Sequence, residues 1–490
     1  MLTGLKRNLM RDVVRMTLLA AAGALVSGCA TVGSDFSAPP NLDAPAYLHQ
    51  AFGAAAADTS TTAVAHLPQQ WWKVFGDAEL NRLESLALTG NPGARAAAQR
   101  LLAAKAQTGL VRSSQSPSLN LGAGVSNQRT SANSAQGKAL GGQAISGNEY
   151  SAGASMAYEL DLWGRVRRLV EASDAQARVA ESDRDGVMLL LSTQVAQTYW
   201  QLRGLDAEMT ILNGALGTRR ESSLLLEARL DAGLSNELDV ARARVERANA
   251  EADLHEVQRQ RNLHEHSLAT LIGVAPSRMR LAPNQAGLPQ PPLIPVGVPA
   301  NLLAQRPDLA GSVAALRAAN AGVGVAEAAF YPSLQLTGSY GYASESLRQL
   351  AQGGSRQFSL GPLALTLPVF DGGRNRANLA VSKARYGEAL ANHEGKLLTA
   401  LREVEDALSD LEQRALQGQV QAEARQAAQR AYLVAQARYE RGVSNYLDVT
   451  DAQRSALAAD RTATQITLER LLATVAVARA LGGGWQPLAN

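Results

Sequence analysis

An internal duplication constrains this chain more than any other feature of its sequence. The segment ARLDAGLSNELDV at 228–240 returns as ARYERGVSNYLDV at 437–449, with eight of thirteen positions identical. A self-match of this kind is typical of duplicated architecture, so the 490 residues are predicted to form two similar halves. In each copy a glycine is placed to end one helix in a left-handed cap, and Ser-Asn to begin the next.

Long helical patterns flank each copy of this turn. The predicted helices cover about 165–230, 236–272, 374–440 and 445–481. At ~1.5 Å per residue the two longer helices would measure ~100 Å, which exceeds the interior of one compact domain. Each turn is therefore predicted to be the tip of an antiparallel helical hairpin, at about 231–238 and about 440–447.

Each half also contains a region where the helical period gives way to strand alternation. These regions predict β-hairpins at about 117–163 and about 332–371. The polar, Gly/Ser-rich segment 126–148 is predicted to be an exposed hairpin loop. In the last strand the alternation shifts at Gly361-Pro362, as it does at a bulge.

Four amphipathic strands are too few to close a barrel by themselves. An open sheet in lipid would leave unpaired edges, and outer-membrane barrels begin at about eight strands. The chain is therefore predicted to oligomerise, since two copies supply about eight strands and three supply about twelve.

The N-terminus carries the features of an export signal. Residues 1–28 combine four basic residues with an apolar run at 16–26. Removing them leaves 43 basic and 43 acidic residues from totals of 47 and 44, so the formal charge of +3 belongs to the leader and does not indicate nucleic-acid binding. The segment ends LVSGCA, and the only cysteine, Cys29, stands where a bacterial lipobox has its lipidated cysteine. The alternative is a buried or free thiol. Ala30, in place of Asp, favours the outer membrane by resemblance to lipoprotein sorting rules.

The rest of the chain divides at the duplication. Residues 29–75 are predicted to be a lipid-anchored tether, 76–285 the first structural repeat, 286–486 the second, and 487–490 a tail. No stretch after the leader reaches the 18 or so near-continuous apolar residues of a membrane helix, so any spanning element is predicted to be a β-strand.

Six motifs give this chain a family resemblance. They are WWKVFGDAELNRLESLALTGNP, YELDLWGRVRR, RPDLAGSVAALRAANAGVGVAEAAFYPSLQL, PVFDGGRNRANL, ARYERGVSNYLDVTDAQR and ALGGGW. In this order, over about 70–486, the chain resembles the TolC-like outer-membrane factor family, in particular its lipid-anchored branch that serves resistance-nodulation-division efflux systems. The resemblance implies a mainly α fold with a transmembrane β section. In the implied homotrimer each protomer supplies four strands and the long helices of two repeats, and a twelve-stranded β-barrel continues into a twelve-helix α-barrel.

The same resemblance implies function and location. The chain would be the outer-membrane channel of a tripartite efflux pump, a passive exit duct for drugs or other small molecules. A periplasmic membrane fusion (adaptor) protein would open it, and an inner-membrane proton-driven pump would supply the energy. The protein would be anchored by lipid in the bacterial outer membrane and extend into the periplasm. A type I secretion conduit that exports a polypeptide is the alternative, and a structural or adhesive coiled-coil lipoprotein is a rival of another class.

In the family the helical tips bind the adaptor and the channel is constricted beside them. The implied adaptor contacts are Arg229, Gly233, Leu234, Ser235, Arg438, Gly442, Val443 and Ser444. Capping alone would explain Gly and Ser, but not why Leu-Asp-Val is also retained after them. The implied pore constriction contains Asp448 and Asp451, which share a helix face at i, i+3, and Asp239 and Arg242 of the first copy. Helix-dipole stabilisation is the alternative explanation of the acids, and a cross-pair between Arg242 and Asp451 is a further hypothesis.

Patterns for other chemistry are weak. LHEHS at 263–267 places its two His on different sides of a helix, without the spacing of a zinc site. GVGVAE at 322–327 lacks the preceding strand and third Gly of a dinucleotide loop, and the family resemblance implies that it lies on a packed helix. No Gly-x-Ser-x-Gly and no phosphate loop occurs. The sequence therefore predicts no catalytic residue, no metal, no cofactor and no nucleic-acid partner.

Overall fold

The computed structural model describes residues 31–39, 47–49, 68–139, 141–292 and 306–485. The predicted signal peptide and Cys29 lie outside these residues. Two compact units divide the chain. The strand unit comprises Met1–Ala38, Leu102–Val179 and Val313–Asn392, and the helix unit comprises Pro39–Leu101, Ala180–Ser312 and His393–Asn490. Each unit takes residues from both predicted repeats, so the spatial division does not follow the duplication.

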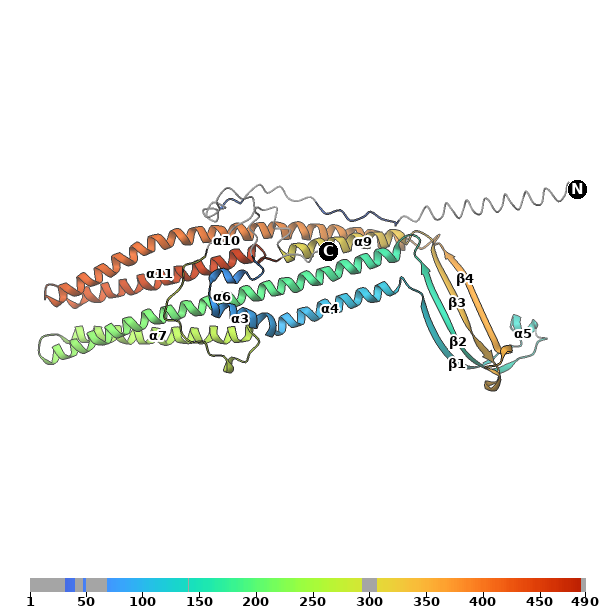
Figure 1. Cartoon of the computed structure of the whole chain (residues 1–490), viewed down its shortest axis with the longest axis horizontal. Helices are drawn as coiled ribbons and strands as arrows, with labels where there is room; N and C mark the ends of the chain where they lie inside the picture. Colours follow the sequence, from blue (N-terminus) through green and yellow to red (C-terminus); the bar gives the residue numbers. More distant parts are fainter. Residues whose placement is uncertain (1–30, 40–46, 50–67, 140, 293–305, 486–490) are drawn as a thin grey trace. The chain divides into compact units, whose positions relative to one another are not determined.

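The two helical hairpins have matching dimensions. Helices α6 (Arg165–Asp231) and α10 (Arg374–Glu440) both contain 67 residues, and α7 (Glu237–Leu271) and α11 (Tyr446–Ala480) both contain 35. Figure 1 shows each long helix turning back into its shorter partner. The duplication has therefore preserved helix lengths as well as the sequence of the turn.

In the described part of the chain before the first strand there are two shorter helices, and a side chain caps each. Asp77 accepts a hydrogen bond of 2.8 Å from a backbone N–H in the first turn of α3 (Ala78–Gly90). Asn91 does the same at 2.7 Å for α4 (Pro92–Ser113). These side chains satisfy N–H groups that have no partner inside a helix, which is why the helices begin there. Among the described residues, four short 3-10 helices lie outside the regular elements: η1 (Trp71–Phe75), η2 (Pro276–Arg278), η4 (Leu347–Gln349) and η5 (Gly353–Ser355).

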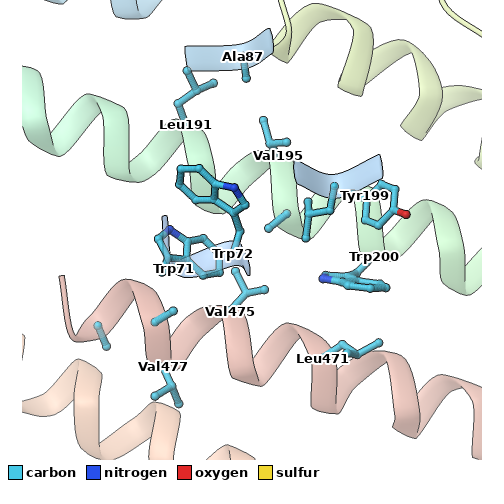
Figure 2. Packing of buried hydrophobic residues seen from close by; sticks show 14 of the residues in the cluster. Trp71, Trp72, Ala87, Leu191, Val195, Tyr199, Trp200, Leu471, Val475 and Val477 are labelled. Atoms are coloured by element: carbon cyan, nitrogen blue, oxygen red, sulfur yellow. The ribbon is translucent and has the colours of Figure 1, made fainter. Parts of the chain in front are cut away.

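The core of the helix unit gathers aromatic side chains. Trp71, Trp72, Tyr199 and Trp200 are all buried in one cluster with leucines and valines of α6 and α11 (Figure 2). The Trp71 indole N–H donates to the Ser192 hydroxyl at 3.1 Å. Large aromatic side chains bury much apolar area, so this cluster joins η1 to α6 and α11 although aromatics are only 4% of the residues.

Helix α9 (Pro307–Ala328) is the one described helix that could cross a membrane by length and composition. Its apolar window has a mean hydropathy of 1.3 and is 39% buried inside the chain. No segment after the leader was expected from the sequence to be as long and apolar as a membrane helix, and that expectation was too strict for α9. Partly buried helices of soluble bundles pass the same test, so the helix alone does not assign a membrane span.

The strand unit contains one antiparallel sheet with the order β1-β2-β3-β4. Its strands are β1 (Ser118–Arg129), β2 (Ser146–Leu160), β3 (Ser333–Ser344) and β4 (Arg356–Thr366). The first loop is shorter than predicted, because both strands extend into the polar segment and a short helix, α5 (Ala135–Ala139), forms between them. The predicted bulge is confirmed by a shift of register in the β3–β4 pair.

The register aligns side chains of one kind across all four strands. One row reads Leu121, Ala154, Tyr340 and Phe358, and the preceding row reads Asn120, Ser155, Ser339 and Ser359. Because neighbouring residues of a strand point to opposite faces, one face of the sheet is apolar and the other is small and polar. Leu121 and Phe358 remain 85% and 77% exposed, and among the described residues β1 and β4 each pair on one side only.

Candidate functional site

The two duplicated turns have the same backbone structure. Gly233 and Gly442 adopt left-handed conformations with φ of 70° and 71°. In each turn the next residue donates its N–H back to the helix, from Leu234 to the Arg229 carbonyl at 2.7 Å and from Val443 to the Arg438 carbonyl at 3.0 Å. This pattern closes the C-terminus of a helix and requires a residue that tolerates positive φ. The glycine at each turn is therefore explained by backbone geometry.

The following asparagines begin the return helices. The side chain of Asn236 accepts from the backbone N–H of Asp239 at 2.9 Å, and that of Asn445 accepts from Asp448 at 3.1 Å. A carboxylate in the first turn is also stabilised by the positive end of the helix dipole. Asp239 and Asp448 thus have a structural role in addition to the pore role predicted for them.

Each turn exposes an apolar side chain directly after its glycine. Leu234 is 78% exposed and Val443 is 63% exposed. Neither Gly233 nor Gly442 has another atom within 4 Å of the position that a Cβ would occupy, so the space beside the turns is open. Ser444 has a buried hydroxyl with no hydrogen-bond partner among the described residues. The turns therefore present small apolar surfaces that no other described part of the chain covers.

The two equivalent arginines of the turns have different surroundings. The Arg229 guanidinium donates to the Tyr439 hydroxyl at 3.2 Å and lies 5.4 Å from the centre of that ring. Tyr439 in turn packs edge-on against buried Tyr446, with ring centroids 5.6 Å apart. Arg438, by contrast, is exposed. Arg229 therefore links the first hairpin to the second, whereas Arg438 projects from the surface.

The predicted constriction residues pair within their own helices. Arg242 lies 3.6 Å from Asp239, and Arg454 lies 3.7 Å from Asp451. Asp448 and Asp451 are both exposed. Among the described residues of this single chain no ion pair joins Arg242 to Asp451, so a cross-pair stays a hypothesis about neighbouring chains.

A buried carboxylate near the turns was not predicted from the sequence. The side chain of Glu246 on α7 is 5% exposed and lies 3.2 Å from Arg219 of α6. Its other oxygen accepts from the Nε of Arg454 on α11 at 2.8 Å. Glu246 therefore joins three helices and connects the first repeat to the second. Nothing local in the sequence indicates this, because the pair spans 208 residues.

The residues singled out for other chemistry do not assemble into a site. In the part of the chain that the structure describes, no three His, Cys, Asp or Glu side chains are placed to hold a metal ion. His264 lies on α7, where burial lowers its pKa. The GVGVAE segment lies within α9, the packed helix to which it was assigned.

Comparison with known proteins identifies relatives over nearly the whole chain. Residues 83–274 and 298–483 match the family described as outer membrane efflux protein. Outer membrane protein OprJ of Pseudomonas aeruginosa is 35% identical, over 93% of this chain and 94% of its own. The antibiotic efflux pump outer membrane protein ArpC of Pseudomonas putida is 32% identical, over 95% of each. The crystal structure of the Campylobacter jejuni CmeC outer membrane channel superposes with a TM-score of 0.86 at 27% identity, over 94% of this chain and 96% of that one. These names describe an outer-membrane protein, an efflux-pump outer-membrane protein and an outer-membrane channel.

Proposed function

Because this chain belongs to the outer membrane efflux protein family, we propose that three copies form one channel that a periplasmic adaptor opens at the helical turns. The chain is an outer-membrane efflux channel, and its long helices extend into the periplasm. In this proposal Cys29 carries the lipid anchor. Transport energy comes from an inner-membrane proton-driven pump, and the channel acts as a passive exit duct without a cofactor.

The sheet supports assembly into a trimer. Its outer strands, β1 and β4, have unpaired edges, and such edges cannot face lipid without losing several kcal/mol per unsatisfied group. Joining β4 of one copy to β1 of the next pairs both edges. Three copies give about twelve strands, with the apolar rows facing lipid and the polar rows facing the lumen, as in other outer-membrane barrels.

The observation that carries adaptor docking is the pair of equivalent turns with uncovered apolar side chains. Leu234 and Val443 project from rigid, hydrogen-bonded turns, so a partner can bury them with little loss of conformational freedom. Three protomers would present six such turns. A partner that binds the open arrangement more tightly than the closed one shifts the channel towards opening, and no motor is needed in the channel itself.

Leu234→Glu is expected to weaken adaptor binding about tenfold or more, because a carboxylate would have to lose its hydration at the contact. Purified trimer and adaptor, compared by surface plasmon resonance, provide the measurement. Leu347→Glu in the loop between β3 and β4 is the matched control, since Leu347 is 66% exposed and Leu234 is 78% exposed. Equal affinities for the two variants would refute docking at the turns.

Removing the acids that follow the second turn tests the constriction. In a trimer Asp448 and Asp451 would form two rings of carboxylates, which attract divalent cations. The variant with both residues changed to Ala is expected to weaken Mg²⁺ block about tenfold in planar bilayers, which corresponds to about 1.4 kcal/mol. Asp406→Ala, at an exposed pair on α10, is the control. Unchanged block in the double variant would exclude these residues from the constriction.

A further inference from the structure

The first described residues of the chain are docked onto the strand unit. Residues 31–36, called here the N-terminal strap, lie against α6 and α9. The backbone N–H of Val32 donates to the Trp163 carbonyl at 2.9 Å, and the Asn320 side chain donates to the Ser34 carbonyl at 3.0 Å. The strap thus donates one hydrogen bond to the bend before α6 and accepts another from α9, two regions that are far apart in the sequence.

A buried arginine directs most of its donors at the strap. The side chain of Arg168 is 5% exposed. It donates to the carbonyls of Val32 at 3.3 Å and Gly33 at 2.9 Å, and to the carboxylate of Asp35 at 2.8 Å. The remaining contact is with Glu171 of α6, at 2.8 Å. A buried guanidinium is costly without partners, so the groove around Arg168 is complete only when the strap occupies it.

Glycines on both sides make the close fit possible. A Cβ on Gly33 would lie 2.8 Å from the Cα of Gly324, and a Cβ on Gly164 would lie 2.6 Å from the Thr31 side chain. Carbon atoms do not approach this closely, so these positions admit no larger residue without a shift. Gly324 belongs to the GVGVAE segment of α9. The glycines of that segment had no assigned role beyond packing, and Gly324 forms part of the wall of the strap groove.

The groove adjoins the end of the sheet. Trp163 follows β2 and stacks against Tyr331, which precedes β3, with ring centroids 4.9 Å apart. The Trp163 indole donates to the Pro332 carbonyl at 2.8 Å. Trp and Tyr are enriched where a membrane meets water, so this pair marks the membrane boundary of a spanning sheet.

We propose that the strap groove is an intramolecular docking site that holds the lipidated N-terminus at the periplasmic edge of the sheet. The inference rests on the proposed lipidation of Cys29. Two peptide units separate Cys29 from Thr31, so the anchor is tethered within ~7 Å of that edge. The groove recognises the backbone and one carboxylate of the chain's own N-terminal segment, and thereby places the acyl chains in the leaflet beside the sheet.

Docking of the strap is expected to keep the sheet close to the lipid anchor, and so to raise the effective concentration of the sheet at the membrane. Without the docked strap, the next described anchor point is Tyr47, 18 residues after Cys29 and buried in the helix unit. A flexible tether of that length has a root-mean-square span of ~25 Å, compared with ~7 Å when the strap is docked. The local concentration falls more than about tenfold, and membrane insertion is expected to slow accordingly.

The test compares two glycines of the same helix. Gly324→Leu pushes against Arg168, the residue that donates to the strap, because a Cβ at Gly324 would lie 3.1 Å from the Cγ, Cδ and Nε atoms of Arg168. Gly322→Leu is the matched control, because no atom outside its own helix lies within 4 Å of a Cβ at Gly322. In the full-length protein Gly324→Leu is expected to raise hydrogen exchange at the Val32 amide at least about 100-fold. It is also expected to slow the conversion of pulse-labelled chains to the trypsin-resistant outer-membrane form about tenfold. Gly322→Leu should match the wild type in both measurements.

A variant on the strap itself separates docking from helix packing. Gly33→Leu leaves α6 and α9 unchanged and is expected to release the strap in the same way, since Gly33 has a φ of 89° and contacts Gly324. Wild-type exchange in both Gly324→Leu and Gly33→Leu would overturn docking. Fast exchange with a wild-type insertion rate would overturn the positioning role. Palmitate labelling is measured in parallel. If the wild-type protein is not labelled, the Cys29 anchor is rejected. Docking of the strap is then still judged from hydrogen exchange alone.

Discussion

Glu246→Ala is expected to lower the free energy of unfolding by about 3–5 kcal/mol, because it leaves buried Arg219 without its carboxylate partner. The side chain of Arg454 is 55% exposed and regains water when the pair is lost, so it contributes less to the cost. The variant also removes a contact between α7 and α11 near the turns. Channel conductance is therefore expected to rise, because the two hairpins lose an ion pair that holds them together.

The same two helices offer a matched control for this variant. Glu251 of α7 lies 3.2 Å from Arg220 of α6, which is also the separation in the Glu246–Arg219 pair. The side chains of Glu251 and Arg220 are, however, 46% and 55% exposed. Exposed pairs contribute about 0–1 kcal/mol, so Glu251→Ala should change stability little. Thermal unfolding of purified trimers in detergent measures both variants. Similar losses for Glu246→Ala and Glu251→Ala would show that burial of the pair does not determine its contribution.

Glu84→Gln is expected to stabilise the protein, by an amount that grows with pH. Glu84 on α3 is fully buried, and neither carboxylate oxygen has a hydrogen-bond partner among the described residues. Burial raises the pKa of Glu84 from its ordinary value of 4.5 to about 9. An acid with a raised pKa keeps its proton more tightly in the folded chain. Its contribution to stability is complete below pH 4.5 and is lost as the pH rises towards about 9.

Gln resembles the protonated acid but does not titrate, so the stability of the variant does not fall as the pH rises through this range. The difference in stability from the wild type should grow by about 1.4 kcal/mol per pH unit, to about 3 kcal/mol at pH 7. Melting temperatures of the variant and the wild type at pH 5 and pH 8 measure this difference, and the two temperatures should nearly coincide at pH 5. Glu79→Gln on the same helix is the opposite control, because hydrogen bonding to Arg82 lowers the pKa of Glu79. A constant difference between Glu84→Gln and wild type across this range would contradict the prediction.

Much of the functional region could be predicted from short sequence patterns. Glycine at 233 and 442, followed by Ser-Asn, correctly placed both turns, and the structure has hydrogen-bonded caps at both. Alternation correctly predicted the strands, although strand ends inside the first polar loop and the short helix α5 were missed. Whether the residues at the turns contact an adaptor or line a constriction stays a prediction, because both depend on neighbouring chains.

By itself the sequence determined the long helices, the caps at the two turns, the presence of the four strands and the duplication. Each of these depends on residues within a few positions of one another, through hydrogen bonds to the fourth residue along a helix or alternation along a strand. Tertiary structure alone decided that Glu246 meets Arg454, that Glu84 is buried with no hydrogen-bond partner among the described residues, and that Arg168 holds the strap. The contacts of Glu246 and Arg168 join segments from different elements of the chain, and the burial of Glu84 likewise depends on the elements packed around α3. Their geometry follows from how whole helices pack, which no local pattern specifies.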